Sequence, residues 1–366
     1  MNAISTAIHV ATLGFVLGGA FGWIAQRTHF CAMGGIADLV LMGDGRRLRA
    51  WFLASAVAIL ATQALVVAGV LDLGTATYLT PRLGWLGAIL GGLLFGFGMT
   101  LAGGCGNKTL VRIGGGSIKA MVVALVLGIT AYMTLRGLLG VVRVAAIEPA
   151  AIDLEPWGVA SQSVSDLIAH AGIAPSAARP IVVLVLAGAL LWWCLKDQRF
   201  RQSRRDVGAG VALGLLIPAG WFATGVVGQD EFEPTALASF TFVAPIGEAI
   251  QYLMVFSGAS INFGIAAVGG VIAGSALGHA TARSFRLETF ATVADALRHL
   301  TGAAMMGFGG VLALGCTIGQ GLSGLSTLAV GSLLAWGAII LGGVLGVRYL
   351  EQGSLGGALK ALFARA

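Results

Sequence analysis

The sequence predicts an all-α polytopic membrane protein, and its composition supplies the main observations. Of its 366 residues, 57% are hydrophobic and only 10% are charged, whereas about 25% are charged in a typical soluble domain. The mean hydropathy is +0.91, and glycine contributes 57 residues without a collagen period. So few charges could not cover a soluble surface, which argues against a soluble enzyme, a secreted disulfide scaffold, a coiled coil and a disordered chain.

About nine apolar segments have the length of a membrane span, which takes roughly 20 residues. They are expected near 7–26, 51–71, 84–103, 117–142, 180–195, 207–228, 260–281, 300–316 and 325–349. Two shorter apolar stretches, 32–42 and 239–256, contain Asp38 and Glu248, respectively. Short segments with ionisable residues predict re-entrant or broken helices.

The basic residues indicate the orientation of these spans, because Lys and Arg accumulate in cytoplasmic loops. With nine spans and the N-terminus outside, 18 of the 22 Lys and Arg residues fall on the cytoplasmic side, as does the C-terminus. The net charge of +6 is therefore attributed to topology. No nucleic acid is expected as a partner, since no basic stretch has interleaved aromatic residues. The first basic residue is Arg27, so no cleavable signal peptide is expected.

Two segments that lie 211 residues apart indicate an internal duplication. Gly96–Cys105 and Gly307–Cys316 are identical at seven of ten positions, and Phe30-Cys31 pairs with Phe242-Val243 at nearly the same offset. Under the expected topology the two halves are inverted around a central pathway. Inverted repeats are common in secondary transporters, whose substrate sites lie near the midplane at interrupted helices.

The duplication also suggests how the chain is organised. Residues 1–142 are expected to form the first transmembrane repeat, and residues 143–206 an outer loop followed by a linking helix. Residues 207–366 would form the second, inverted repeat and a short cytoplasmic tail. A duplicated bundle can also be a mere scaffold, but a transporter or channel is the better explanation of this plan.

Cys105 and Cys316 occupy equivalent positions in the repeat, each between a glycine-rich helix and a short polar turn. Glycine beside a cysteine lets the backbone approach a ligand closely, and a broken helix can direct N–H groups at an anion. We therefore interpret both as substrate-binding residues, although a free cysteine is also a common core residue. The turns contribute the supporting candidates Gly104, Gly106, Asn107, Lys108, Gly315, Thr317, Gln320 and Ser323.

Other residues have a functional and a structural interpretation. Cys31 precedes the short segment 32–42, but its repeat partner is Val243, so symmetry does not require a thiol there. Lys108 attracts an anion or simply follows the positive-inside rule. Glu248 is a candidate because ionisable residues in apolar segments are commonly functional, yet it could face water at a bend. Cys194 lies beside interfacial tryptophans and is interpreted as structural.

Signatures of catalysis are absent from the sequence. It has no Walker motif, no H-E-x-x-H and no G-x-S-x-G, and its four widely spaced cysteines form no C-x-x-C. Ser117, after a run of three glycines, is predicted as a helix N-cap rather than part of a nucleotide loop. No enzymatic activity, cofactor or metal is expected.

Three motifs resemble the YeeE/YedE family of sulfur transporters, and the resemblance covers nearly the whole chain. They are the Gln26-Arg27…Phe30-Cys31 segment and the turns at 103–105 and 315–324. The resemblance implies thiosulfate uptake by a multi-pass protein of the bacterial inner membrane. It also implies a ligand path of three cysteines, which match Cys31, Cys105 and Cys316, and a sulfur-carrier protein of the TusA type as a candidate cytoplasmic partner. Cys194 matches no motif of the family.

The side-chain chemistry is compatible with this resemblance. Thiosulfate is a dianion with one soft terminal sulfur, to which neutral thiols can donate S–H hydrogen bonds. Weak sites in series permit both binding and release, in an order of cysteines that the sequence leaves open. The alternatives are transport of another sulfur or selenium species, an intramembrane thiol enzyme that passes sulfur covalently between cysteines, and a scaffold without transport.

Overall fold

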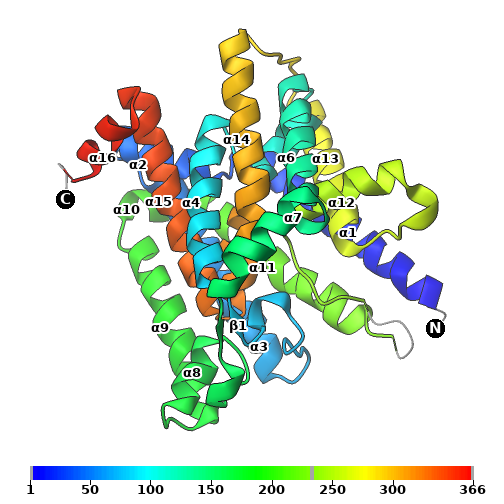
Figure 1. Ribbon diagram of the computed structural model, residues 1–366, viewed down its shortest axis with the longest axis vertical. Coiled ribbons are helices and arrows are strands. Elements are labelled where there is room, and N and C mark those ends of the chain that lie inside the picture. Colours follow the sequence, from blue (N-terminus) through cyan, green and yellow to red (C-terminus); the bar gives the residue numbers. More distant parts are fainter. Residues whose placement is uncertain (1–2, 231–234, 364–366) are drawn as a thin grey trace.

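The protein folds almost entirely into helices in the computed structural model, which describes residues 3–230 and 235–363 (Figure 1). The helices are α1 (Ala3–Thr28), α2 (Ala32–Met42), α3 (Arg46–Val67), α4 (Trp85–Leu101), α5 (Gly106–Gly114), α6 (Ile118–Arg136), α7 (Leu138–Val142), α8 (Val164–His170), α9 (Pro175–Leu195), α10 (Gln198–Gln202), α11 (Arg204–Phe222), α12 (Val243–Met254), α13 (Phe263–Thr281), α14 (Val293–Leu312), α15 (Val330–Gln352) and α16 (Leu355–Phe363). Two short strands, β1 (Arg82–Leu83) and β2 (Ile152–Asp153), pair antiparallel. The expected all-α class is confirmed.

Within the described ranges, eight helical stretches are long and apolar enough to cross a membrane. Two of them join a long helix to the short one after it, α1 to α2 and α4 to α5. The expectation was about nine spans, and the difference lies at α14. This helix has 20 residues, but its first two turns carry Asp295, Arg298 and His299. These residues lower the mean hydropathy of α14, although it packs along the spanning helices α4 and α6.

Several helix ends differ from the expected boundaries. The fourth span was expected to reach residue 142, but α6 ends at Arg136, because Gly137 adopts an extended conformation with ψ −156°. The last span was expected from residue 325 but begins at Val330, since residues 317–326 form a separate short helix. The predicted broken segments correspond to α2, whose bounds of 32 and 42 match, and to α12. Ser117 caps α6 as predicted, because its side chain accepts the Ala120 N–H.

Helices of the two halves pack in exchanged pairs. α1 packs along α13 while α3 packs along α11, and α4 packs along α15 while α6 packs along α14. Each pair therefore has a counterpart in which first-half and second-half helices change places, the pattern expected of two duplicated halves related by a two-fold axis. α4, α14 and α15 lie side by side in the middle of the molecule (Figure 1), and α9 packs against α3.

Glycine permits the closest of these helix contacts. A Cβ on Gly22 of α1 would overlap the Val271 carbonyl group of α13, and a Cβ on Gly274 of α13 would overlap the backbone of Gly19. In lipid, such small residues allow the backbones to approach and gain van der Waals contact. The glycine excess of the composition is thus partly a packing feature.

Candidate functional site

The three candidate cysteines each stand at the start of a short helix. Cys31 is the N-cap of α2, and its sulfur accepts the Gly34 N–H at 3.4 Å. Cys316 precedes the helical residues 317–326, and its sulfur accepts the Gly319 N–H, also at 3.4 Å. Cys105 is the N-cap of α5. Helix N-termini carry a partial positive charge, so each thiol lies where an anion would be stabilised.

These thiols are buried and close to one another. Their residues are 4%, 1% and 0% exposed in chain order, and all are free rather than disulfide-bonded. The Cys105 thiol lies close to the Cys31 thiol and to the side chain of Thr317, whose buried hydroxyl has no hydrogen-bond partner among the described residues. Cys105 is therefore the middle member, between α2 and the short helix that follows Cys316.

A polar cavity of about 640 Å³ lies near Cys31. It is lined by Thr28, His29, Asp38, Met42, Asp44, Arg46, Arg47, Lys108, Ser203, Arg205 and Asp206. Two of its arginines are neutralised, since Arg47 pairs with Asp38 at 2.9 Å and Arg46 with Asp44 at 2.7 Å. Among the described side chains Lys108 has no carboxylate partner. It lies three residues after Cys105, so it brings a positive charge close to the thiols.

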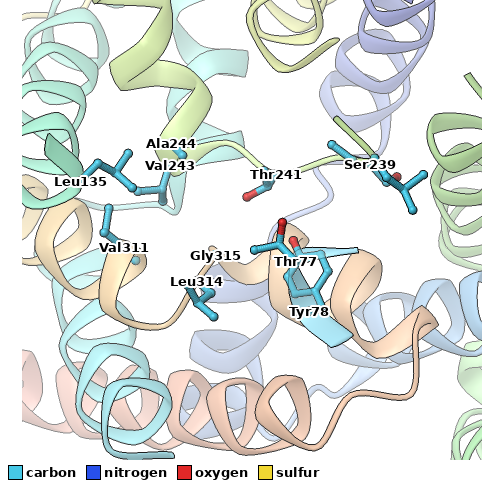
Figure 2. A pocket seen from close by; sticks show the side chains of 13 residues that line it. Thr77, Tyr78, Leu135, Ser239, Thr241, Val243, Ala244, Val311, Leu314 and Gly315 are labelled. Atoms are coloured by element: carbon cyan, nitrogen blue, oxygen red, sulfur yellow. The ribbon is translucent and has the colours of Figure 1, made fainter. Parts of the chain in front are cut away.

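A second cavity, of about 200 Å³, is almost entirely apolar (Figure 2). We call it the apolar cavity; its lining residues are Thr77, Tyr78, Leu135, Leu237, Ala238, Ser239, Thr241, Val243, Ala244, Gly310, Val311, Leu314 and Gly315. None of these side chains is charged, and the polar side-chain atoms are hydroxyl groups. Burial raises the pKa of the Tyr78 phenol above its ordinary value, so Tyr78 remains a hydrogen-bond donor.

The two cavities lie at opposite ends of the same helices. The polar cavity is lined by residues at the starts of α3 and α11, whereas the apolar cavity is lined by residues that follow the C-terminal ends of these helices. α3 has 22 residues, which corresponds to a length of about 33 Å. Cys31 therefore lies near the cavity at one end of these helices, and Cys316, which follows Gly315, lies near the cavity at the other end.

The predicted supporting residues of the first turn surround Cys105. This turn is helical, because α5 begins at Gly106. A Cβ on Gly104 would stand 2.9 Å from the Lys108 side chain, so glycine makes room for that lysine. Asn107 is 1% exposed, and its Oδ1 has no partner among the described residues. It is a buried acceptor in the first turn after Cys105.

The predicted supporting residues of the second turn, around Cys316, are all buried. Gly315 borders the apolar cavity, and Thr317 contacts Cys105. Gln320 donates its Nε2 hydrogen bond to the Ala313 carbonyl, and Ser323 donates to the Phe240 carbonyl at 2.6 Å. The structure thus assigns Gln320 and Ser323 contacts that hold the backbone around Cys316.

The helix after Cys316 is also held by two neighbouring helices. Residues 319–324 are π-helical, and side chains of α3 satisfy carbonyl groups of this helix. Ser55 donates to the Gly321 carbonyl at 2.9 Å, and Gln63 donates to the Ser326 carbonyl at 2.7 Å. Trp221 of α11 donates to the Ser326 hydroxyl at 3.0 Å. Sequence reasoning missed all three residues; the signal available was a polar side chain within an otherwise apolar span.

Two further residues missed from the sequence are Tyr78 and Thr241. Their hydroxyl oxygens both lie beside Gly319, at the end of the apolar cavity. They come from segments outside the long helices, the turn Thr77–Leu79 and the stretch before α12. No motif connects these segments, so only the folded chain brings them together.

Two of the residues considered from the sequence lie apart from this constellation. Glu248 accepts a hydrogen bond from Asn262 at 2.9 Å and lines a different cavity, together with Arg136; its predicted supporting role remains a prediction. Cys194 donates to the Arg49 carbonyl at 3.3 Å in the contact between α9 and α3. That contact agrees with its interpretation as a structural residue.

Ion pairs connect α5 and the start of α6 to the loop before α14 and to the first turn of α14. Arg112 pairs with Glu288 at 2.7 Å, and Ser117 donates to the same carboxylate at 3.0 Å. Lys119 pairs with Asp295 at 2.7 Å. The hydrogen bond from Lys119 lowers the pKa of Asp295 to about 2. In residues 3–230 and 235–363 no cluster of three metal-ligating side chains is present.

A buried series of thiols between two cavities, in a bundle of spanning helices, defines a membrane transport protein, and comparison with known proteins identifies its family. The family model for sulphur transport matches residues 27–345, and the chain belongs to this family. The chain is 26% identical over 329 residues to the thiosulfate transporter TsuA of Escherichia coli strain K12, covering 84% of this chain and 86% of that protein. It is also 26% identical over 321 residues to TsuA of Spirochaeta thermophila, covering 85% and 90%. The probable transporter YedE of Salmonella typhimurium is 34% identical over 114 residues, which cover 30% of this chain and 26% of YedE.

Proposed function

We propose that this protein takes up thiosulfate across the bacterial inner membrane by passing it along Cys316, Cys105 and Cys31. The observation that carries the proposal is the alignment of three buried thiols, each at the start of a short helix, between the apolar and the polar cavity. The names of the relatives support thiosulfate as the substrate. With α14 crossing the membrane as the ninth span, the N-terminus would lie outside and the C-terminus in the cytoplasm, in two inverted repeats, 1–142 and 207–366, linked by 143–206.

The order of the thiols follows from their neighbours. Gly315, the residue before Cys316, borders the apolar cavity. Cys105 contacts both Thr317 and Cys31, and Lys108 of the polar cavity lies one helical turn beyond Cys105. The positive-inside rule assigns the arginine-rich polar cavity to the cytoplasm. Inward transport would then proceed from the apolar cavity through Cys316 and Cys105 to Cys31.

Each step would exchange one weak set of contacts for another. A neutral thiol donates S–H to the terminal sulfur of thiosulfate, while N–H groups of the adjacent helix start can bind its oxygens. Deprotonated thiols would repel the dianion, so the thiol form is the competent one. Because no single site holds the anion strongly, it can move on. Lipid surrounds the bundle, and a TusA-like carrier protein would receive sulfur at the cytoplasmic cavity.

The direct test is uptake of labelled thiosulfate by proteoliposomes that contain the wild type or single Cys→Ala variants. Variants at Cys31, Cys105 and Cys316 should lose most of the uptake, whereas Cys194→Ala is the matched control and should retain it. Unlabelled sulfite, sulfide and selenium compounds, added as competitors, define the substrate. Retained uptake in all three relay variants would refute the relay, and no uptake by the wild type would favour a scaffold.

Covalent sulfur transfer is the second candidate, because the adjacent Cys31 and Cys105 thiols suit it. A thiolate would attack the terminal sulfur of thiosulfate, forming a persulfide as the sulfur–sulfur bond breaks and sulfite leaves. No other oxidant or reductant is required. Trapping of a persulfide on Cys31 or Cys105 during turnover, with release of sulfite, would establish this enzyme-like route.

A further inference from the structure

The apolar cavity stops short of the nearest thiol. Tyr78, Thr241 and Gly315 border it, whereas Cys316 does not and is 0% exposed. Figure 2 shows Thr241 and Tyr78 on separate segments of the chain that face each other across the cavity. The cavity therefore ends one residue short of Cys316.

Two hydroxyl groups lie above the helix turn that binds Cys316. The point at which a Cβ would stand on Gly319 is 2.5 Å from the Thr241 oxygen and 3.4 Å from the Tyr78 oxygen. Gly319 is the residue whose N–H donates to the Cys316 sulfur. The two hydroxyl groups thus cover the backbone next to the thiol.

We propose that the Tyr78–Thr241 pair is a gate, and that its hydroxyl groups are specificity-determining ligands for the incoming anion. With the pair closed, no solute reaches Cys316 from the apolar cavity. When it separates, the same two hydroxyl groups can donate to the oxygens of an oxyanion, which the apolar side chains of the cavity cannot do. A soft anion without oxygens, such as hydrosulfide, would gain less from them.

The supporting segments suit such a movement. Tyr78 belongs to the three-residue turn Thr77–Leu79, and Thr241 to non-helical chain before α12. Either can shift without moving a spanning helix. The inference rests on the proposed function for its substrate, but the opening of the gate can be measured without transport.

The test is the rate at which Cys316 is modified in full-length protein whose other three cysteines are replaced by alanine. The probe is the anionic thiol reagent sulfonatoethyl methanethiosulfonate, and intact mass measures the product. Tyr78→Phe and Thr241→Val should each accelerate modification about fivefold, the change expected when one neutral polar contact of the closed pair is lost. Thr77→Val is the matched control, because Thr77 lines the same cavity but is exposed; its rate should equal that of the parent.

Thr241→Ser retains the hydroxyl group and should restore the parental rate, which separates gating from misfolding. Equal rates in the parent, Tyr78→Phe and Thr241→Val would overturn the gate, as would equal acceleration in Thr77→Val. Because labelling needs no uptake, accelerated modification supports the gate even if the wild type fails to transport thiosulfate. The role in specificity is tested by uptake assays with unlabelled competitors. It is supported if the oxyanions sulfite and thiosulfate both compete less well in Tyr78→Phe than in the wild type, while competition by hydrosulfide is unchanged.

Discussion

The Ser323→Ala substitution tests whether the helix after Cys316 is held in place by side-chain hydrogen bonds. Ser323 is 0% exposed, and its hydroxyl donates to the Phe240 carbonyl at 2.6 Å. Alanine would remove the donor and leave a buried carbonyl group unpaired. Phe240 directly precedes Thr241, so the same bond connects the Cys316 helix to the chain that bears one hydroxyl of the proposed gate.

The expected cost follows from these contacts. An unpaired buried acceptor costs about 1–3 kcal/mol in a protein interior, while hydrogen bonds between membrane helices average about 0.6 kcal/mol and reach about 1.7. The removed atom is a single oxygen, so the cavity contribution is small. We expect Ser323→Ala to lower the free energy of unfolding by about 1–2 kcal/mol.

Reversible unfolding in mixed micelles, followed by tryptophan fluorescence, would measure this difference. Ser260→Ala is the matched control, because Ser260 is exposed and lines a different cavity; it should stay within about 0.5 kcal/mol of the wild type. Ser323→Ala with wild-type stability would show that water or another group replaces the donor, and that this bond does not hold the helix.

Two further substitutions test packing and charge. Gly274→Ala should lower the free energy of unfolding by at least about 1–3 kcal/mol, because its Cβ would overlap the backbone of Gly19; a wild-type unfolding curve would contradict the close approach of α1 and α13. The pKa of Asp295 is lowered to about 2 by Lys119, so this pair stabilises the fold above the ordinary carboxyl pKa of about 3.9 and loses that contribution as the pH falls toward 2. Unfolding midpoints at acidic pH should therefore fall more in the wild type than in Asp295→Asn, and equal falls would refute the linkage.

Features determined by local composition could be predicted from the sequence. The broken helix at 32–42 is predicted to the residue, because its apolar run ends at Gly43, which adopts a left-handed conformation as a helix C-cap. The repeat singled out Cys105 and Cys316, whose equivalent places at the starts of short helices reflect the duplication. Cys31 was ambiguous from symmetry alone, and its contact with Cys105 is what joins it to the others.

Features determined by tertiary contacts could not be predicted. Residues 315–324 are expected to be a polar turn, yet residues 317–326 are helical, with carbonyl groups bonded by Ser55 and Gln63 of a distant segment. Tyr78 and Thr241 lie more than a hundred residues apart in the sequence, and neither has a motif. Their shared position follows from the packing of α3 and α11, which a single sequence does not reveal.

The difference between the two cavities bears on how the proposed uptake could be driven. A dianion moving inward against a membrane potential of 100 mV, negative inside, faces about 4.6 kcal/mol, since each charge contributes about 2.3 kcal/mol. Lys108 can stabilise the anion at its cavity, but a fixed charge changes only the depth of a site and not the concentrations at equilibrium. Net uptake therefore requires either a coupled ion or removal of the substrate on the cytoplasmic side. A sulfur carrier that consumes thiosulfate at the polar cavity would remove the substrate in this way. The final amount of thiosulfate taken up by empty liposomes should therefore be small, and it should rise when such an acceptor is enclosed.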